Sequence, residues 1–212
     1  MSRLLFIAAH PLTAAASKTL AVAEVFLDAY RERHGAAAVT TLNLFAETIP
    51  ALTGATFDAW KKIKTGAALT DLPPAEQQEM ARHHELLTQF LAHDKYVFAN
   101  PLWNFFLPPV AKQYIDLLCV SGKTFRYTPN GPVGLLPEKK VLHIQSAGGV
   151  YDRGAGAANA DFADAYLRHL MKFFGIADFS GIYIDGGDAF PQRRDAIVAE
   201  AKEAARELAA KF

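Results

Sequence analysis

The 212-residue sequence is poor in three features that would narrow its class: cysteine, net charge and long apolar runs. Cys119 is the only cysteine, so no internal disulfide can form, which favours a reducing compartment. Lys and Arg number 22, as do Asp and Glu, and no block of five like charges occurs. This balance gives no electrostatic reason to expect nucleic acid or an anionic membrane as partner. No stretch approaches the ~18 apolar residues of a membrane span.

The N-terminus imitates a signal peptide without meeting its requirements. Arg3 precedes the apolar run LLFIAA, but His10 and Pro11 end that run. The run is therefore shorter than the roughly 7–15 residues of a secretory core. We interpret it as a first β-strand and expect a cytoplasmic protein.

Short apolar runs alternate with helical patterns along the chain. The expected strands are 3–8, 38–42, 95–99, 140–145 and 181–184, and the expected helices are 17–33, 74–92, 108–120, 158–174 and 191–211. This order predicts an α/β fold, namely a flavodoxin-like doubly wound five-stranded parallel sheet with helices on both faces. We expect one domain over residues 1–212. Residues 43–73 are irregular, and 121–138 are expected to form a long loop, a kind that is often functional.

The segment AHPLTAAASKT, residues 9–19, leads from the first expected strand into a helix. Unpaired N–H groups and the helix dipole favour an anion there. Ser17 and Thr19 add hydroxyl groups and Lys18 adds a positive charge, while His10 lies at the start of the segment. One interpretation is a phosphate cradle, and the alternative is that Ser17 is only a helix N-cap. The pattern matches neither the P-loop nor the dinucleotide glycine motif.

The segment ANPLWNFFLPP, residues 99–109, follows the third expected strand and is rich in aromatic side chains. Pro101 stiffens the turn, and Asn104 and nearby amides supply donors. Leu102, Trp103 and Phe105 can form an apolar wall. A planar heteroaromatic ligand needs this mixture of apolar faces and a few polar contacts. The alternative is a core cluster or a contact between subunits.

The segment QSAGGVY, residues 145–151, follows the fourth expected strand. Gly148 and Gly149 allow close approach of the backbone to a ligand, and Ser146 adds a hydroxyl group. The alternative for the two glycines is a plain turn. Tyr151 is either a substrate-contacting residue at the rim of the site or simply a packed aromatic side chain.

The three segments follow strands of one parallel sheet, so we expect them at its carboxyl edge, where such sheets bind ligands. FMN fits this arrangement, with its phosphate at the first segment and its ring between the other two. NAD alone fits less well, because the dinucleotide glycine pattern is missing.

Two longer stretches, PLWNFFLPPVAKQYIDLLCVSGKTFRYTPNGPVGLL at 101–136 and SAGGVY at 146–151, resemble the FMN-dependent NADH:quinone oxidoreductases known as azoreductases. The resemblance implies a homodimer with one FMN per subunit, NADH or NADPH as electron donor, and quinones or azo compounds as acceptors. It implies cofactor contacts from Ser17, Lys18, Thr19, Leu102, Trp103, Asn104, Phe105, Ser146, Ala147, Gly148 and Gly149. It also places Phe125 near the substrate.

The sequence departs from this family at two positions. Many members have Ser where this chain has His10, and Arg where it has Ala147. We expect His10 and Pro101 to line the cofactor site nonetheless. We expect neither a catalytic side-chain acid or base nor a metal site. His83, His84 and His93 are expected on a surface helix, and His143 is expected to pack within a strand.

Three rival interpretations stay open. The protein is a quinone reductase of the same fold without useful azo activity, a flavodoxin-like electron carrier that docks on other proteins, or a non-catalytic binding protein. The neutral charge disfavours the carrier, since such carriers tend to be strongly acidic. The long loop at 121–138 also disfavours it, since such carriers tend to lack a substrate pocket.

Overall fold

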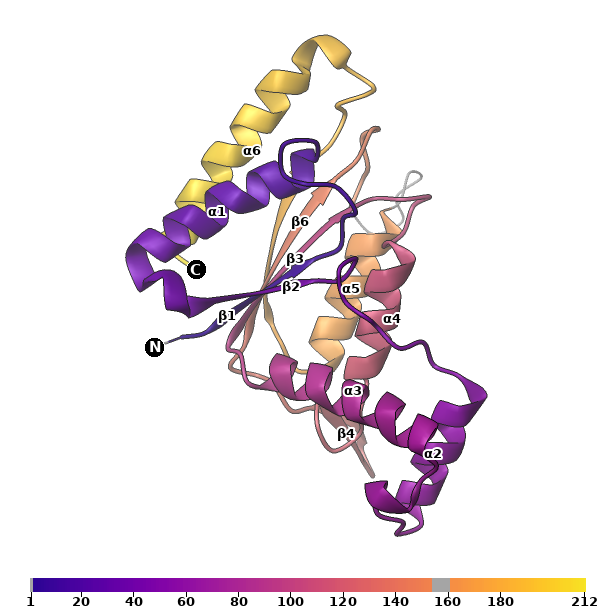
Figure 1. Ribbon diagram of the computed structural model, residues 1–212. Coiled ribbons are helices and arrows are strands. Elements are labelled where there is room, and N and C mark those ends of the chain that lie inside the picture. Colours follow the sequence, from indigo (N-terminus) through magenta and orange to yellow (C-terminus); the bar gives the residue numbers. More distant parts are fainter. Residues whose placement is uncertain (1, 154–160) are drawn as a thin grey trace.

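A five-stranded parallel sheet with strand order β2-β1-β3-β6-β7 lies at the centre of the computed structural model, which describes residues 2–153 and 161–212 (Figure 1). Its strands are β1 Leu4–Ala8, β2 Val39–Asn43, β3 Lys95–Pro101, β6 Lys140–Ser146 and β7 Asp178–Ile184. Helices connect successive strands of this sheet, and helices on both faces confirm the doubly wound α/β fold.

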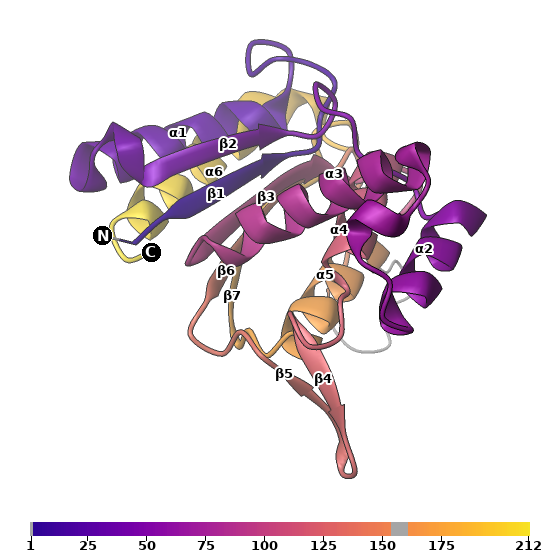
Figure 2. The ribbon, with the colours of Figure 1, turned by 60° about the horizontal axis from the view of Figure 1, so that its bottom comes forward.

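Helices cover both faces of the sheet (Figures 1 and 2). One face carries α1 Lys18–His34 and α6 Arg194–Ala209, and the other carries α3 Pro74–Leu91, α4 Pro109–Leu118 and α5 Phe162–Phe173. Along β1, Leu4 and Phe6 belong to the first core layer, whereas Leu5 and Ile7 belong to the second. Both faces of the strand are therefore buried, which is why its sequence is a continuous apolar run.

Residues 43–73, expected to be irregular, contain the helix α2 Gly54–Lys64. It begins with a capping box in which the Thr53 hydroxyl accepts from the Thr56 amide at 3.2 Å and the Thr56 hydroxyl accepts from the Thr53 amide at 3.0 Å. α2 packs against α3 around a small third cluster of Ala59, Leu72 and Met80. Short 3-10 turns lie at Ala36–Ala38, Leu69–Asp71 and Pro191–Arg193.

The expected loop at 121–138 contains an antiparallel hairpin of β4 Phe125–Thr128 and β5 Gly131–Gly134, which projects from the body of the molecule (Figure 2). Its base is fixed where the Leu136 amide donates to the Phe174 carbonyl at 2.9 Å. Gly134 lies so close to Gly175 that a Cβ there would be 2.1 Å from the Gly175 nitrogen. The prediction of one long loop is therefore wrong, because two short strands pair within it and a tertiary contact is needed to stabilise such a pairing.

Other differences concern the ends of elements. β3 and β7 are longer than expected, and the last helix begins three residues late, after a 3-10 turn at Pro191–Arg193. The helix expected at 158–174 begins at Phe162, and residues 158–160 lie outside the described ranges. Within those ranges, no helix is long and apolar enough to cross a membrane.

Candidate functional site

The three predicted loops meet at the carboxyl edge of the sheet, because β1, β3 and β6 are parallel neighbours. Ser146 lies at their junction. Its carbonyl accepts from the Leu102 amide at 2.8 Å, and its hydroxyl oxygen accepts from the Thr19 hydroxyl at 2.7 Å. One residue thus joins the loop after β3 and the first turn of α1 to the end of β6.

The loop after β3 forms a tight turn over residues 103–106. Trp103 and Phe106 exchange two backbone hydrogen bonds of 3.0 and 2.9 Å. Asn104 and Phe105 have φ values of +49° and +67°, as the central residues of a type I′ turn do. Asn tolerates this backbone well, but for Phe105 it is strained by about 1–3 kcal/mol. Such strain is typical of functional turns and persists only where the surroundings enforce it.

This turn directs its aromatic side chains outward. Trp103 is 39% exposed and Phe105 51% exposed, so the alternative that they form a core cluster is wrong. Trp103 meets Phe45, which follows β2, edge to face at 6.2 Å, and Phe105 meets Tyr151 in the same manner at 6.0 Å. The edge thus carries aromatic surface from three loops. Phe45 is not among the site residues predicted from the sequence.

The first turn of α1 is compatible with both interpretations of Ser17, the helix N-cap and part of a phosphate cradle. Its hydroxyl oxygen accepts from the Leu20 amide at 3.3 Å, so the N-cap role is confirmed. Thr19 is buried against Ser146, and the Lys18 ammonium lies 3.7 Å from a carboxylate oxygen of Asp188. A hydroxyl, an ammonium and a helix N-terminus therefore lie together, which suits a phosphate.

A fourth loop, which sequence reasoning missed, follows β7 and joins the site. The amides of Asp188 and Ala189 both donate to the Gly148 carbonyl at 3.0 Å. A Cβ on Gly148 would lie 2.4 Å from an Asp188 carboxylate oxygen, so this glycine makes room for Asp188. A Cβ on Gly149 would meet only Tyr151, at an ordinary 3.4 Å. The space beside the Gly149 Cα is therefore more open to a ligand than the space beside the Gly148 Cα, which Asp188 fills.

The two positions that depart from the family pattern are both near this edge. The His10 Nδ1 atom accepts from the Leu12 amide at 3.1 Å, and burial lowers the pKa of His10. A neutral ring therefore adds no positive charge to the first loop at pH 7. The Ala147 side chain is buried, and its amide donates to the Ile184 carbonyl at 3.1 Å. Pro101, the last residue of β3, is buried beside Ser146.

Phe125 does not join the other predicted residues within one subunit. It is only 7% exposed and packs against Phe173, with ring centroids 4.5 Å apart, at the base of the hairpin. The reason is topological. α4 starts at the carboxyl edge and runs back across the sheet, so the hairpin that follows begins at the opposite edge (Figure 2). That Phe125 lies near the substrate stays a prediction, since the resemblance places the active sites at the interface of a homodimer and one subunit alone does not test it.

Two of the predictions for histidines are wrong. His83 and His93 are buried, although His84 is exposed as expected. His83 packs edge to face on Trp60 at 6.0 Å, because α2 covers this face of α3. In the described part of the chain, no three His, Cys, Asp or Glu side chains are placed to hold a metal ion. Burial raises the pKa of Cys119 to about 11, so this thiol is unreactive at pH 7.

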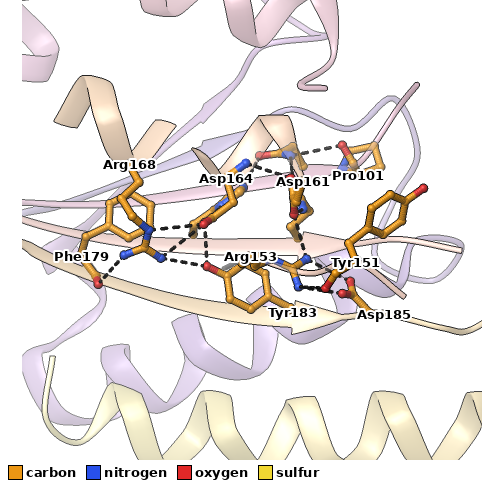
Figure 3. Close-up of polar contacts among 12 residues, drawn as sticks. Pro101, Tyr151, Arg153, Asp161, Asp164, Arg168, Phe179, Tyr183 and Asp185 are labelled. Atoms are coloured by element: carbon orange, nitrogen blue, oxygen red, sulfur yellow. Dashed lines mark hydrogen bonds and ion pairs between the residues drawn. The ribbon is translucent and has the colours of Figure 1, made fainter. Parts of the chain in front are cut away.

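Beneath the loops lies a set of buried or half-buried polar side chains that sequence reasoning did not assemble (Figure 3). We call it the buried polar network, and its members are Asn100, His143, Gln145, Asp161, Asp164 and Tyr183. His143 packs within its strand as predicted. Its partners come from other elements and lie up to 43 residues away, so no local pattern could reveal them.

Comparison with known proteins agrees with this geometry. A family described as having a flavodoxin-like fold matches residues 2–209. The FMN-dependent NADH:quinone oxidoreductase 2 of Lactiplantibacillus plantarum is 46% identical over 212 residues, and the FMN-dependent NADH:quinone oxidoreductase of Staphylococcus haemolyticus is 44% identical. Both alignments cover the whole of both chains.

Solved structures give the same result. A crystal structure of an azoreductase from Bacillus anthracis superposes with a TM-score of 0.91 at 35% identity, covering all of both chains. An FMN-dependent NADH-azoreductase from Bacillus anthracis in complex with FMN superposes with a TM-score of 0.87 at 30% identity, covering 99% of this chain and 100% of the other. The chain therefore belongs to the family of FMN-dependent NADH:quinone oxidoreductases, within the flavodoxin-like fold.

Proposed function

We propose that this protein binds FMN at the carboxyl edge of its sheet and transfers two electrons from NADH or NADPH to quinones and azo compounds. The observation that carries the proposal is the meeting of three loops at Ser146, with hydroxyl and ammonium groups on one side and exposed aromatic rings on the other. The names of the relatives, which specify FMN, NADH and quinone, support it.

The residues at this edge suit the parts of FMN. Ser17, Lys18 and Thr19 supply a helix N-terminus, an ammonium and hydroxyl groups for a phosphate. Leu102, Trp103 and Phe105 supply apolar surface for a planar ring, and Asn104 supplies a polar contact at its rim. Ser146, Ala147, Gly148 and Gly149 present backbone close by, and Gly149 has no side chain to prevent approach.

FMN, when bound, supplies the hydride chemistry, and the protein binds it, orients it and adjusts its electronics. We propose that the amides of Gly148 and Gly149 stabilise negative charge on the reduced ring, as preorganised donors do. Tyr151 and Phe105 present an aromatic rim on which a flat acceptor can stack. We propose ping-pong kinetics, in which the nicotinamide donor leaves before the acceptor binds.

An electron carrier is the second candidate. The zero net charge disfavours it, because docking carriers rely on a strong charge of one sign. Direct, rapid oxidation of NADH by the purified protein would exclude a pure carrier, whereas a reduced protein that reacts only with other proteins would favour it.

The proposal is tested by absorbance of the purified protein with added FMN, before and after anaerobic addition of NADH or NADPH. We expect flavin bands that bleach with at least one of the two donors. A colourless protein that takes up no FMN would refute the proposal. Steady-state rates with quinones and azo dyes then rank the acceptors, and parallel initial-rate lines are expected for a ping-pong order.

A further inference from the structure

One face of the sheet changes from apolar to polar along β3, β6 and β7. Tyr96 and Val141 lie toward the amino ends, and Phe98 lies at mid-strand, where it pairs in register with His143; all three apolar residues belong to the main core. On the same face, the residues from His143 onward are polar, namely His143 itself and, nearer the carboxyl ends, Asn100, Gln145 and Tyr183. They meet Asp161 and Asp164 at the start of α5. Buried polar groups cost stability unless they are satisfied, so this change calls for a reason.

His143 is fully buried and is bonded through both ring nitrogens. Nδ1 lies 3.0 Å from a carboxylate oxygen of Asp164, and Nε2 lies 3.0 Å from Oδ1 of Asn100. The Asn100 orientation follows from its amide nitrogen, which donates to the Pro101 carbonyl at 3.2 Å. A carbonyl can only accept, so Oδ1 must face His143, and Nε2 carries a proton.

Asp164 is held as a carboxylate on the other side of the ring. Burial alone would raise its pKa, but the hydrogen bond and charge of His143, with Tyr183 and Arg168, lower the pKa to about 2. The Tyr183 hydroxyl donates to Asp164 at 2.6 Å, and it has room only because residue 181 is glycine. A Cβ on Gly181 would lie 2.1 Å from that hydroxyl oxygen. With a carboxylate on one side and an amide oxygen on the other, both nitrogens of His143 donate.

Charged groups surround the pair. Arg168 of α5 contacts Asp164 at 3.3 Å. Asp161, at the start of α5, accepts from Gln145 and from the Asp164 amide, and it pairs with Arg153 at 2.8 Å. Arg153 also pairs with Asp185 at 2.7 Å. Gln145 in turn accepts from the Asn100 amide at 3.2 Å. These bonds hold Asn100 from two sides.

The buried polar network reaches the backbone just before the turn of residues 103–106. Asn100 holds the Pro101 carbonyl, and Ser146 holds the amide of the next residue, Leu102. The peptide between Pro101 and Leu102 is therefore fixed at both its oxygen and its nitrogen, just before the turn of residues 103–106 that contains the strained residue Phe105. Strain of this kind needs surroundings that enforce it.

We propose that His143 is a positioning residue for the cofactor site: through Asn100 it fixes the Pro101–Leu102 peptide, and thereby the turn that presents Trp103 and Phe105. The inference rests on the proposed function for its ligand. Replacing His143 alone leaves the buried Asp164 without a partner, so a lower melting temperature is expected whichever role His143 has. A histidine that served stability alone would, however, leave the geometry of the turn and the FMN affinity unchanged when replaced.

The test compares His143→Phe and His143→Gln with Val141→Ala. Val141 is a matched control, because it lies on the same strand and face, is fully buried and is not part of the network. For each protein, the measurements are the melting temperature, the FMN dissociation constant by fluorescence, and hydrogen exchange of the Leu102 amide without flavin.

We expect His143→Phe to weaken FMN binding on the order of tenfold, as displaced positioning does, and to speed exchange of the Leu102 amide. His143→Gln should fall between it and the wild type, since glutamine keeps one link. Val141→Ala should lower the melting temperature but keep FMN affinity within about twofold and Leu102 exchange unchanged.

Unchanged affinity and exchange in His143→Phe would overturn the inference, as would equal weakening by Val141→Ala at equal loss of melting temperature. If His143→Phe does not fold, His143→Gln decides by the same criteria. If the wild type binds no FMN, the proposed function fails, and Leu102 exchange still tests the positioning.

Discussion

Gly149 is the residue of this site at which an added side chain would disturb the fold least and the ligand most. A Cβ there meets only Tyr151 at ordinary contact distance, so the fold itself tolerates a small side chain. We therefore expect Gly149→Val to weaken FMN binding by at least about tenfold, by intruding where the backbone approaches the ligand. The melting temperature should change little.

Titration with FMN and a thermal melt test this prediction. Gly54→Val is the control, since a Cβ at Gly54 lies in open space far from the site. Retained affinity in Gly149→Val would mean that the loop after β6 lies elsewhere relative to the cofactor.

Two buried tyrosines make a matched pair in the core. Among the described residues, the Tyr114 hydroxyl finds no hydrogen-bond partner, whereas the Tyr96 hydroxyl donates to the carbonyls of Phe90 at 2.8 Å and His93 at 3.0 Å. An unsatisfied buried hydroxyl costs about 1–3 kcal/mol, and a made hydrogen bond contributes about 1 kcal/mol. Tyr114→Phe should therefore leave the free energy of unfolding equal or higher, and Tyr96→Phe should lower it by about 1 kcal/mol. Urea denaturation measures both, and a loss in Tyr114→Phe would reveal a partner for its hydroxyl.

At the scale of elements, the α2–α3 pair contains a pH-sensitive contact. His83 is buried on α3 under Trp60, and its Nε2 has no partner among the described residues. Burial lowers the pKa of His83, although Glu79 opposes this. The unfolded chain thus binds a proton more readily than the folded one, so stability should fall as pH drops below about 6.5, the unfolded value.

Urea unfolding at pH 7.5 and pH 5 tests this contact. We expect the wild type to lose more stability on acidification than His83→Leu does. His84→Gln is the control, because His84 is the exposed neighbour on the same helix. Equal losses in the wild type and His83→Leu would show that other groups cause the change.

The turn after β3 carries the exposed aromatic side chains of the proposed FMN site. Trp103 is half-exposed and meets Phe45 at its edge, so removing its ring should change the free energy of unfolding by no more than about 0.5 kcal/mol. Trp103→Ala should nevertheless weaken FMN binding or change the ratio of quinone to azo rates. Phe57→Ala is the control, an exposed aromatic on α2. Unchanged affinity and kinetics would assign Trp103 to packing between subunits instead.

On the scale of the whole molecule, the exposed apolar side chains concern assembly. Several large ones lie open, namely Phe45, Phe57, Trp103, Phe105, Tyr127, Phe162 and Phe190. Apolar surface of this kind commonly marks a binding or subunit surface. We predict a homodimer, with a mass by light scattering of twice 23.1 kDa that persists on dilution. A mass of one chain would contradict it.

The amino-acid sequence alone predicts the five strands of the parallel sheet and the helices between them other than α2, because apolar runs such as that of β1 are buried on both faces and give a local signal. It also placed Ser17, Trp103 and Ser146 at one edge, since parallel strands end together. The tertiary structure places Phe125 at the opposite edge, pairs β4 with β5 as a hairpin and buries His83, and the sequence predicts none of these. The tertiary structure alone joined His143 to Asn100 and Asp164. Periodicity records which faces are buried but not which distant side chain covers them, and hydrogen bonds between elements leave no trace in local spacing.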